Sequence, residues 1–309
     1  MNESAYHEPV LVREVLDHLI TTDSGVYVDA TLGGGGHAEA VLGRLGPKGR
    51  LFGLDRDAEA VSFSRSRLAS YGSRAVLSQG EFASLDSAAA SAGFSGADGI
   101  LFDLGVSSRQ LDSAGRGFSY RMDGPLDLRM DDRLPVTAAE IVNSLPEREL
   151  ADLIFRYGEE RNSRRIARCI VRRRGRMRIG TTAELAETVR RAGAGPFPEK
   201  TLSRVFQALR MKVNDEPGQL AAGLDSAERL LRPGGRLVVI SYHSLEDRAV
   251  KRFIRGPESP APRWAPAPPA RFRVLTRRAV MPSTEECETN PRSRSARLRA
   301  AEKTSDGKI

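Results

Sequence analysis

Short apolar runs alternate with helical patterns over the first hundred residues. The apolar runs predict strands at 26–28, 50–55, 75–77 and 99–103. The segments between them carry apolar residues at helical spacing. The last strand is a continuous apolar run, as in a parallel strand covered on both faces. Strands that alternate with helices predict a parallel, doubly wound α/β sheet.

This alternation stops near residue 110 and resumes near residue 217. The stretch between contains two capping-box sequences, Thr137-x-x-Glu140 and Thr181-x-x-Glu184, and no convincing strand. A helix over 217–231 and a strand over 236–241 then restore the pattern. We therefore expect one sheet domain in two parts, residues 1–109 and 215–309, interrupted by an all-helical insertion, residues 110–214.

Two features of the last sixty residues complete the expected fold. The proline-rich stretch 258–271 around Trp264 predicts a loop. The segment Ala296–Ala300 alternates between polar and apolar residues, which is typical of an edge strand.

Net charge adds a candidate partner. With 48 Lys and Arg against 40 Asp and Glu, the formal net charge is +8, which favours a polyanion such as nucleic acid. A predicted helix from Arg161 to Arg178 holds nine arginines, while Ile166, Ile170 and Val171 can face a core. This cluster favours contact with phosphates, and a solvated helix face is the alternative.

Other classes of protein are disfavoured. No apolar run approaches the length of a membrane span, and Met1–Pro9 has no features of a signal peptide, so we expect a cytoplasmic protein without membrane contact. Cys169 and Cys287 are far apart, which indicates neither a disulfide framework nor a metal site.

A glycine-rich loop, Gly33–Gly36, lies between the first strand and the first helix. Glycines there let a nucleotide cofactor approach the backbone, and a Walker phosphate loop is excluded because no Gly-Lys-Ser/Thr follows. Asp55 ends the second strand, where its carboxylate can accept both hydroxyls of a ribose. A bare turn and a helix cap at Asp55 are the alternatives. Both NAD and S-adenosylmethionine fit these two features.

Longer fragments carry a family resemblance. Residues 29–37 (DATLGGGGH), 53–57 (GLDRD), 98–108 (DGILFDLGVSS) and 231–237 (LRPGGRL) look like successive class I methyltransferase motifs. Residues 116–131 (RGFSYRMDGPLDLRMD) and 241–248 (SYHSLEDR) resemble the ribosomal RNA small-subunit methyltransferase H family. The resemblance spans nearly the whole chain.

The resemblance implies a Rossmann-like class I methyltransferase sheet with S-adenosylmethionine as methyl donor. It also implies the substrate, the exocyclic N4 of a cytosine in the decoding region of small-subunit (16S) ribosomal RNA. Phe82 would lie beside the adenine and Asp55 at the ribose. The full set of cofactor contacts implied by the matching motifs is Gly35, Gly36, His37, Asp55, Phe82, Asp103 and Gln110.

Asp103 is the candidate catalytic residue. It ends the fourth strand beside the expected cofactor crevice, where it could accept a hydrogen bond from the amino group that is methylated. Related amino-methyltransferases carry an Asp-Pro-Pro-Tyr type motif here, whereas this chain has Leu104-Gly105-Val106, so a contact with the methionine amine of the cofactor is the alternative. Methylation at carbon C5 would need a cysteine nucleophile, and no cysteine lies in any motif.

Several other side chains admit two interpretations. His37 and His243 are interpreted as hydrogen-bonding residues rather than as acids or bases. Phe118 and Tyr120 could stack on a base or belong to a core. Two rival functions also stay open, an NAD-dependent oxidoreductase and a non-catalytic RNA-binding assembly factor. The sequence does not indicate the oligomeric state.

Overall fold

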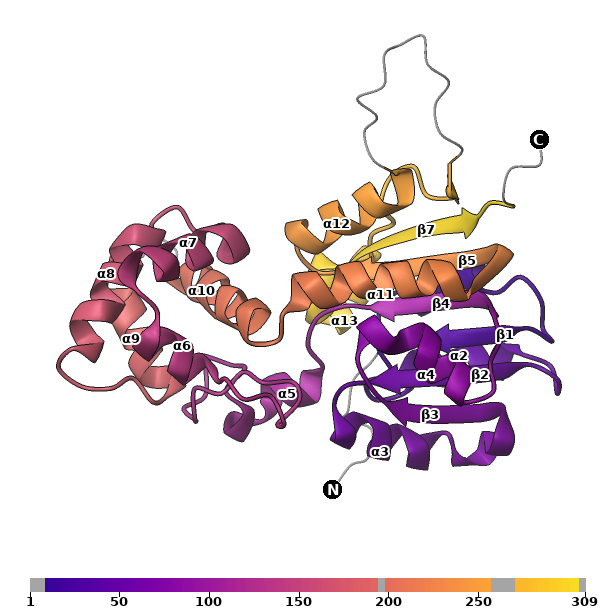
Figure 1. Cartoon of the computed structure of the whole chain (residues 1–309), viewed down its shortest axis with the longest axis horizontal. Coiled ribbons are helices and arrows are strands. Elements are labelled where there is room, and N and C mark those ends of the chain that lie inside the picture. The colour runs from indigo at the N-terminus through magenta and orange to yellow at the C-terminus, as the bar shows by residue number, and fades with distance from the viewer. Residues whose placement is uncertain (1–8, 194–197, 257–269, 306–309) are drawn as a thin grey trace, which may run out of the picture. The chain divides into compact units, whose positions relative to one another are not determined.

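The computed structural model describes residues 9–193, 198–256 and 270–305, and the chain divides into two compact units (Figure 1). The sheet unit consists of the residues up to Gly105 and those from Gln219 onward, and the helical unit of Val106–Gly218. The insertion predicted at 110–214 thus extends four residues further at each end. The loop predicted around Trp264 and residues 1–8 lie outside the described residues.

The sheet unit contains seven strands in the order β3-β2-β1-β4-β5-β7-β6. β1 to β5 are parallel, and β7 is antiparallel to both β5 and β6. The predicted doubly wound sheet is therefore confirmed, with two strands added, of which only β7 runs antiparallel to β1–β5. The strands are β1 (Val26–Asp29), β2 (Arg50–Asp55), β3 (Ala75–Gln79), β4 (Ala97–Asp103), β5 (Leu231–Ser241), β6 (Phe272–Val274) and β7 (Arg297–Lys303).

The prediction of an edge strand at Ala296–Ala300 is wrong. β7 lies inside the sheet, because β6 pairs with its outer side and itself forms the edge. β6 has only three residues and buries only Phe272, so it has too little alternation to be detected as a strand. Residues 232–235, between the predicted helix and the predicted strand, lie within β5 as an irregularity, where pairing with β4 passes from Leu231–Ala97 to Arg236–Gly99.

Helices cover both faces of this sheet. Alternate strand residues face opposite sides: Leu101 packs with α1, α2 and α3, whereas Ile100 and Phe102 pack with α4, α11 and α12. A short helix, α13 (Thr284–Thr289), precedes β7. The helices are α1 (Val12–Leu19), α2 (Gly36–Arg44), α3 (Ala58–Arg67), α4 (Leu85–Ser91), α11 (Glu216–Leu230) and α12 (Ser244–Arg255).

The helical unit has a hydrophobic core of its own, in which Leu150, Ile154 and Leu209 are fully buried. Both predicted capping boxes are present, at the starts of α6 and α9. Among its described residues the only β pairing is one isolated bridge, Pro125–Thr181. The helices are α5 (Ser108–Asp112), α6 (Ala138–Ser144), α7 (Glu147–Gly158), α8 (Ser163–Arg174), α9 (Thr182–Arg191) and α10 (Pro198–Val213).

The arginine-rich helix is shorter than predicted. α8 covers 163–174 instead of 161–178, because the chain turns after Gly175 and the guanidinium of Arg173 donates to the carbonyl oxygen of Met177. Ile166 and Ile170 are buried as expected, whereas Val171 is only half-buried. Each helix in the described ranges is too short or too polar to cross a lipid bilayer.

Candidate functional site

Three adjacent parallel strands of the sheet unit end in an aspartate. Asp29 ends β1, Asp55 ends β2 and Asp103 ends β4. β1 lies between β2 and β4, and the strand order reverses between β1 and β4. Ligands of open α/β sheets bind at such a switch point, outside the carboxyl ends of the strands. The three carboxylates therefore mark the candidate site.

The glycine-rich loop is fixed at this edge by its backbone. Gly33 and Gly35 have positive φ angles of 50° and 75°. The N–H of Gly33 donates to Oδ2 of Asp55 at 2.8 Å, and the hydroxyl of Ser64 donates to the carbonyl oxygen of Gly33 at 2.8 Å. A Cβ on Gly35 would lie 2.9 Å from Oγ of Ser64, and one on Gly36 would lie 3.0 Å from Pro9. The loop can pass this closely only because both positions lack a side chain.

Asp55 connects this loop with the start of α3. Its Oδ1 accepts a hydrogen bond from the N–H of Asp57 at 2.9 Å. Burial raises the pKa of Asp55 to about 6, against the opposing effect of these backbone N–H groups. The helix-cap alternative is wrong, because Asp57 is the residue that caps α3. A carboxylate has about four acceptor positions, so Asp55 retains capacity for ribose hydroxyls.

Asp103 lies within a cluster of polar side chains. The hydroxyl of Tyr242, just after β5, donates to Oδ1 of Asp103 at 2.9 Å. Nε2 of His37 lies 3.4 Å from Oδ2 of Asp103. The N–H of Asp103 donates to Oγ1 of Thr31 at 2.6 Å. Burial, together with the Asp103 carboxylate, raises the pKa of Tyr242 well above 10, so the phenol stays a hydrogen-bond donor.

His37 is buried at the second position of α2. Burial lowers the pKa of its imidazole, but the carboxylates of Asp103 and Asp29 outweigh this effect, and the pKa is raised above 6.5. Within the described residues, neither ring nitrogen has a hydrogen-bond partner. His243, by contrast, caps α12 by accepting the N–H of Glu246, which agrees with its interpretation as a hydrogen-bonding residue.

Asp29 was not among the predicted site residues. It is 2% exposed, and its Oδ1 accepts the N–H of Thr31 at 3.1 Å. Its Oδ2 has no partner within the described residues. Burial raises the pKa of Asp29 to about 6, opposed by the nearby charge of His37. Tyr242 was missed as well, because only the folded sheet brings it to Asp103.

The structure assigns the remaining predicted residues to different units. Phe82 follows β3 in a short 3₁₀ turn and meets Phe102 edge-on, with ring centroids 5.5 Å apart, so it is half-buried against β4. Gln110 belongs to the helical unit. Its Oε1 accepts the N–H of Ser107 at 3.1 Å, which completes the capping box of α5. Six of the seven predicted cofactor contacts thus lie in the sheet unit.

The family model of the MraW methylase family matches residues 4–304. The chain belongs to the MraW methylase family. It is 47% identical over 307 residues to the ribosomal RNA small subunit methyltransferase H of Carboxydothermus hydrogenoformans, covering 97% of this chain and 98% of that protein. It is 49% identical to the proteins of the same name from Syntrophobacter fumaroxidans (96% and 96% covered) and Geobacter sulfurreducens (96% and 98% covered).

This membership confirms the predicted family, the enzyme class and S-adenosylmethionine as cofactor, and it decides against the NAD-dependent oxidoreductase. The sheet edge of the methylase fits that cofactor. The glycine loop leaves bare backbone, Asp55 has spare acceptor positions, and the buried Oδ2 of Asp29 lacks a donor. An unpartnered buried carboxylate oxygen is costly unless a ligand supplies the donor.

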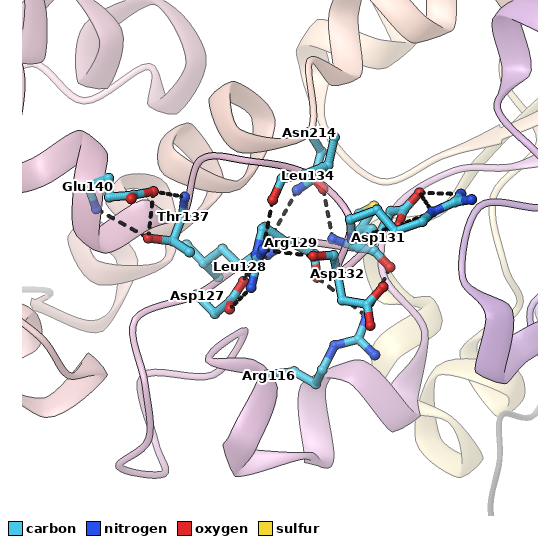
Figure 2. Close-up of polar contacts among 12 residues, drawn as sticks. Arg116, Asp127, Leu128, Arg129, Asp131, Asp132, Leu134, Thr137, Glu140 and Asn214 are labelled. Atoms are coloured by element: carbon cyan, nitrogen blue, oxygen red, sulfur yellow. Dashed lines mark hydrogen bonds and ion pairs between the residues drawn. The ribbon is translucent and has the colours of Figure 1, made fainter.

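The methylase also contains a second polar cluster, in the loop 116–134 of the helical unit (Figure 2). The guanidinium of Arg129 binds both carboxylate oxygens of Asp127 at 2.8 Å and also donates to the carbonyl oxygens of Asp132 and Leu134. From the end of α10, the side chain of Asn214 accepts the N–H of Met130 and donates to the carbonyl oxygen of Leu128, each at 2.8 Å. The side chains of Asp127, Arg129 and Asn214 thus all have protein partners.

Phe118 and Tyr120, the two aromatic residues of this loop, pack against the core of the helical unit. Phe118 is 5% exposed and belongs to the core of the helical unit, so the base-stacking alternative for Phe118 is wrong. Tyr120 packs edge-on against Phe206 with ring centroids 5.5 Å apart, and its hydroxyl lies 3.2 Å from Oγ of Ser203. The core interpretation therefore holds for Phe118, whereas Tyr120 is half-buried at the margin of the same core.

Proposed function

We propose that this methylase transfers a methyl group from S-adenosylmethionine to the exocyclic N4 of a cytosine in the decoding region of small-subunit ribosomal RNA, in the cytoplasm. The names of its relatives support ribosomal RNA as substrate. The observation that carries the choice of a nitrogen atom is the position of Asp103, a strand-end carboxylate held by Tyr242 beside the cofactor loop.

The chemistry requires positioning and a proton acceptor. S-adenosylmethionine supplies an electrophilic methyl group on a sulfonium. The cytosine amino nitrogen is a poor nucleophile, because its lone pair is delocalised into the ring, and it must lose a proton as it attacks. Asp103 accepts a hydrogen bond from this amino group. Tyr242 occupies Oδ1 of Asp103 and thereby fixes the direction of Oδ2.

Methylation of a ring carbon does not fit the site. It would need a thiolate that adds to the base. Cys169 packs against the core of the helical unit, and Cys287 lies on α13, where Ser293 contacts its sulfur. The described side chains around Asp103 in the sheet unit include no cysteine.

The cofactor is held by the other strand ends. Asp55 accepts the ribose hydroxyls, and Phe82 provides an apolar wall for the adenine. The bare backbone at Gly35 and Gly36 lets the methionine part approach, with the free Oδ2 of Asp29 as acceptor for its ammonium. His37 completes the set in the sheet unit, and Gln110 of the helical unit stays a contact that only the family motifs imply.

The helical unit binds the RNA. Its residues 106–218 hold 22 Lys and Arg against 16 Asp and Glu, a net charge of +6. Arg173 and Arg174 of α8 already donate to carbonyl oxygens of Met177 and Val142. The arginines that remain exposed on α8 are Arg164, Arg165, Arg168 and Arg172. Of these, Arg164, Arg168 and Arg172 recur every four residues and form one basic stripe for phosphates.

A methyl-transfer assay tests this function. Small ribosomal subunits from a strain that lacks the enzyme are incubated with the protein and S-adenosylmethionine carrying a labelled methyl group, and the nucleosides are analysed by mass spectrometry. We expect N4-methylated cytidine, and a much slower formation of it with the Asp103→Asn variant. Label in C5-methylcytidine would contradict the assignment of the nitrogen. Binding of the subunit without any transfer would instead support a non-catalytic assembly factor.

A further inference from the structure

The two sequence segments that form the sheet unit have net charges of opposite sign. Residues 1–105 hold 8 Lys and Arg against 14 Asp and Glu, a net charge of −6, whereas residues 219–309 hold 18 against 10, a net charge of +8. Both segments belong to the same compact unit. A polyanion that bound only to the helical insertion would give no reason for this second basic segment.

Four of these cations lie on helix α12, whose place in the sheet unit Figure 1 shows. Arg248, Lys251, Arg252 and Arg255 follow the spacing i, i+3, i+4, i+7, which puts them on one side of a helix, and all four are exposed. The opposite side of α12 packs its apolar residues into the core of the sheet unit, chiefly Val250 and Ile254. We call these four cations the α12 stripe.

Asp247 of α12 makes its ion pairs with β7, although the charge of Lys251 also helps to lower its pKa. Asp247 binds the guanidinium of Arg299 at 2.6 Å and lies 3.6 Å from that of Arg297, both on β7. Burial would raise the pKa of Asp247, but Arg299 outweighs it and holds the pKa below its usual value. Glu246 is occupied in the capping box with His243.

Most of the stripe is free of carboxylate partners. Within the described part of the chain, no carboxylate lies within 4.0 Å of the charged groups of Lys251, Arg252 or Arg255. Arg271 and Arg273, beside and on β6, differ from these three cations, because Arg273 pairs with Glu302 and Arg271 with Glu228, each at 2.8 Å. A shallow hollow between α12, β6 and β7 is lined by Lys251, Arg255 and Arg299, together with Ile254, Val274, Thr276 and Ala300.

The stripe begins close to the candidate site. α12 starts two residues after Tyr242, whose hydroxyl contacts Asp103. At 1.5 Å of rise per residue, the stripe extends from about 6 Å to about 16 Å along the helix axis from Ser244. A strand bound along α12 would therefore approach the edge of the site where the amino group must be positioned.

We propose that the α12 stripe is a second RNA-binding surface, which binds backbone phosphates of the RNA strand next to the target nucleotide. The inference rests on the proposed function, in which RNA is the substrate. Three of its four cations are arginines, whose planar guanidinium matches the geometry of phosphate oxygens. An anionic membrane surface fits less well, because a helix that lies on a membrane needs an exposed apolar face, whereas that of α12 is buried.

The test compares two variants with the same change in net charge. The stripe variant replaces Lys251, Arg252 and Arg255 by Gln, which preserves helix propensity. The control variant carries Arg13→Gln, Arg44→Gln and Lys48→Gln, three exposed cations of the acidic segment. Affinity for undermethylated small subunits, and for a single-stranded RNA of about 20 nucleotides, is measured at several salt concentrations. Circular dichroism checks that both variants are folded.

We expect the slope of log affinity against log salt to become shallower by about two in the stripe variant, at ~0.7 for each of three phosphate contacts, and to stay unchanged in the control. KM for the small subunit should rise at least about tenfold, with kcat at saturating subunit unchanged. Equal slopes in the two variants would overturn the proposal. So would stripe-dependent binding to phosphatidylglycerol vesicles without any effect on RNA.

Failure of this inference is distinguishable from failure of the proposed function. The wild-type protein is assayed for methyl transfer on the same subunits. If the wild type transfers methyl groups and the stripe variant binds RNA as the wild type does, only the second surface is refuted. If the wild type transfers none, the proposed function fails, and the salt slopes still report whether α12 contacts RNA.

Discussion

Two regions of this protein bury charged and polar side chains, but the regions differ in whether these side chains have hydrogen-bond partners. In the cluster around the loop 116–134 of the helical unit, the side chains of Arg129 and Asn214 each make several hydrogen bonds to the protein. At and beside the strand ends of the sheet unit, Oδ2 of Asp29 and both ring nitrogens of His37 have no hydrogen-bond partner in the described protein. Among the described residues of the helical unit, no buried side-chain nitrogen or oxygen lacks a hydrogen-bond partner.

This difference distinguishes side chains that await a ligand from side chains that stabilise the fold. Each buried polar group without a partner costs about 1 to 3 kcal/mol, so a protein retains one only where something else compensates. A fully satisfied network instead stabilises an irregular backbone. Leu128 has a φ of 65°, and the hydrogen bond from Asn214 to its carbonyl oxygen helps to hold it in this disfavoured region. We therefore expect substitutions at the strand ends of the sheet unit to change ligand binding, and substitutions in the loop 116–134 to change stability.

The largest expected effect concerns Asp103. Asp103→Asn keeps the shape of the side chain but removes the charge that accepts the N–H of the substrate, so single-turnover methyl transfer should fall by a factor of about 10² to 10⁴. The rate is measured at saturating cofactor and RNA. If that rate is unchanged while cofactor affinity falls, Asp103 is only a contact for the methionine amine.

The next effect should appear in stability rather than in binding. Asn214→Leu leaves the carbonyl oxygen of Leu128 and the N–H of Met130 buried without partners, so the free energy of unfolding should fall by about 2 to 4 kcal/mol. Urea unfolding measures the loss, and hydrogen exchange assigns it to the helical unit. Asp29→Asn is the matched control in the other region. A similar loss in Asp29→Asn would remove the distinction between the two regions.

Cofactor affinity should respond to Asp55. Asp55→Ala removes a charge-assisted acceptor for the ribose hydroxyls, which should weaken binding of S-adenosylmethionine by roughly 1.5 to 3 kcal/mol. It also releases the N–H groups of Gly33 and Asp57. Calorimetry on the folded variant measures the dissociation constant, and an unchanged value would refute this role of Asp55.

The smallest effect is a pH dependence with opposite signs for stability and binding. The pKa of Asp29 and that of Asp55 are both about 6, above the unfolded value of 3.8, so the folded protein binds more protons between these values. Their contribution to stability is complete below pH 3.8 and is lost as pH rises through about 6. Affinity for the cationic cofactor should instead rise over the same interval, because ionised carboxylates bind it better.

Titration calorimetry between pH 5 and pH 8 measures this dependence, and thermal unfolding without cofactor measures the stability. Asp29→Asn should flatten both curves. A cofactor affinity that does not change with pH in the wild type would show that these carboxylates do not contact the cofactor.

The sequence predicted those parts of the site that local patterns encode. Asp55 and the glycine loop were identifiable because a strand, a turn and a helix follow one another within thirty residues. Tyr242 could not be placed beside Asp103, since their 139-residue separation is closed only by the pairing of β4 with β5. Asp29 was in principle visible as a strand-end acid, but its unpartnered oxygen is a property of the packed structure.

Errors in the fold have the same origin. β7 was expected at the sheet edge because strand position depends on β6, a three-residue partner without a pattern of its own. α8 was expected to extend to Arg178 because arginine has high helix propensity, whereas the backbone turns at Gly175 and buries Ile179 instead. Tertiary contacts decided both cases.

The place of β7 inside the sheet has a consequence for biosynthesis. The helical unit is one continuous segment, Val106–Gly218, and can fold while later residues are still being translated. The sheet cannot be completed before the end of translation, because β7 pairs with β5 on one side and with β6 on the other. Lys303 at the end of β7 also donates to the carbonyl oxygens of Glu228 and Leu231. Until residue 303 has left the ribosome, β5 has an open edge, so the nascent sheet unit must be protected from aggregation longer than the helical insertion.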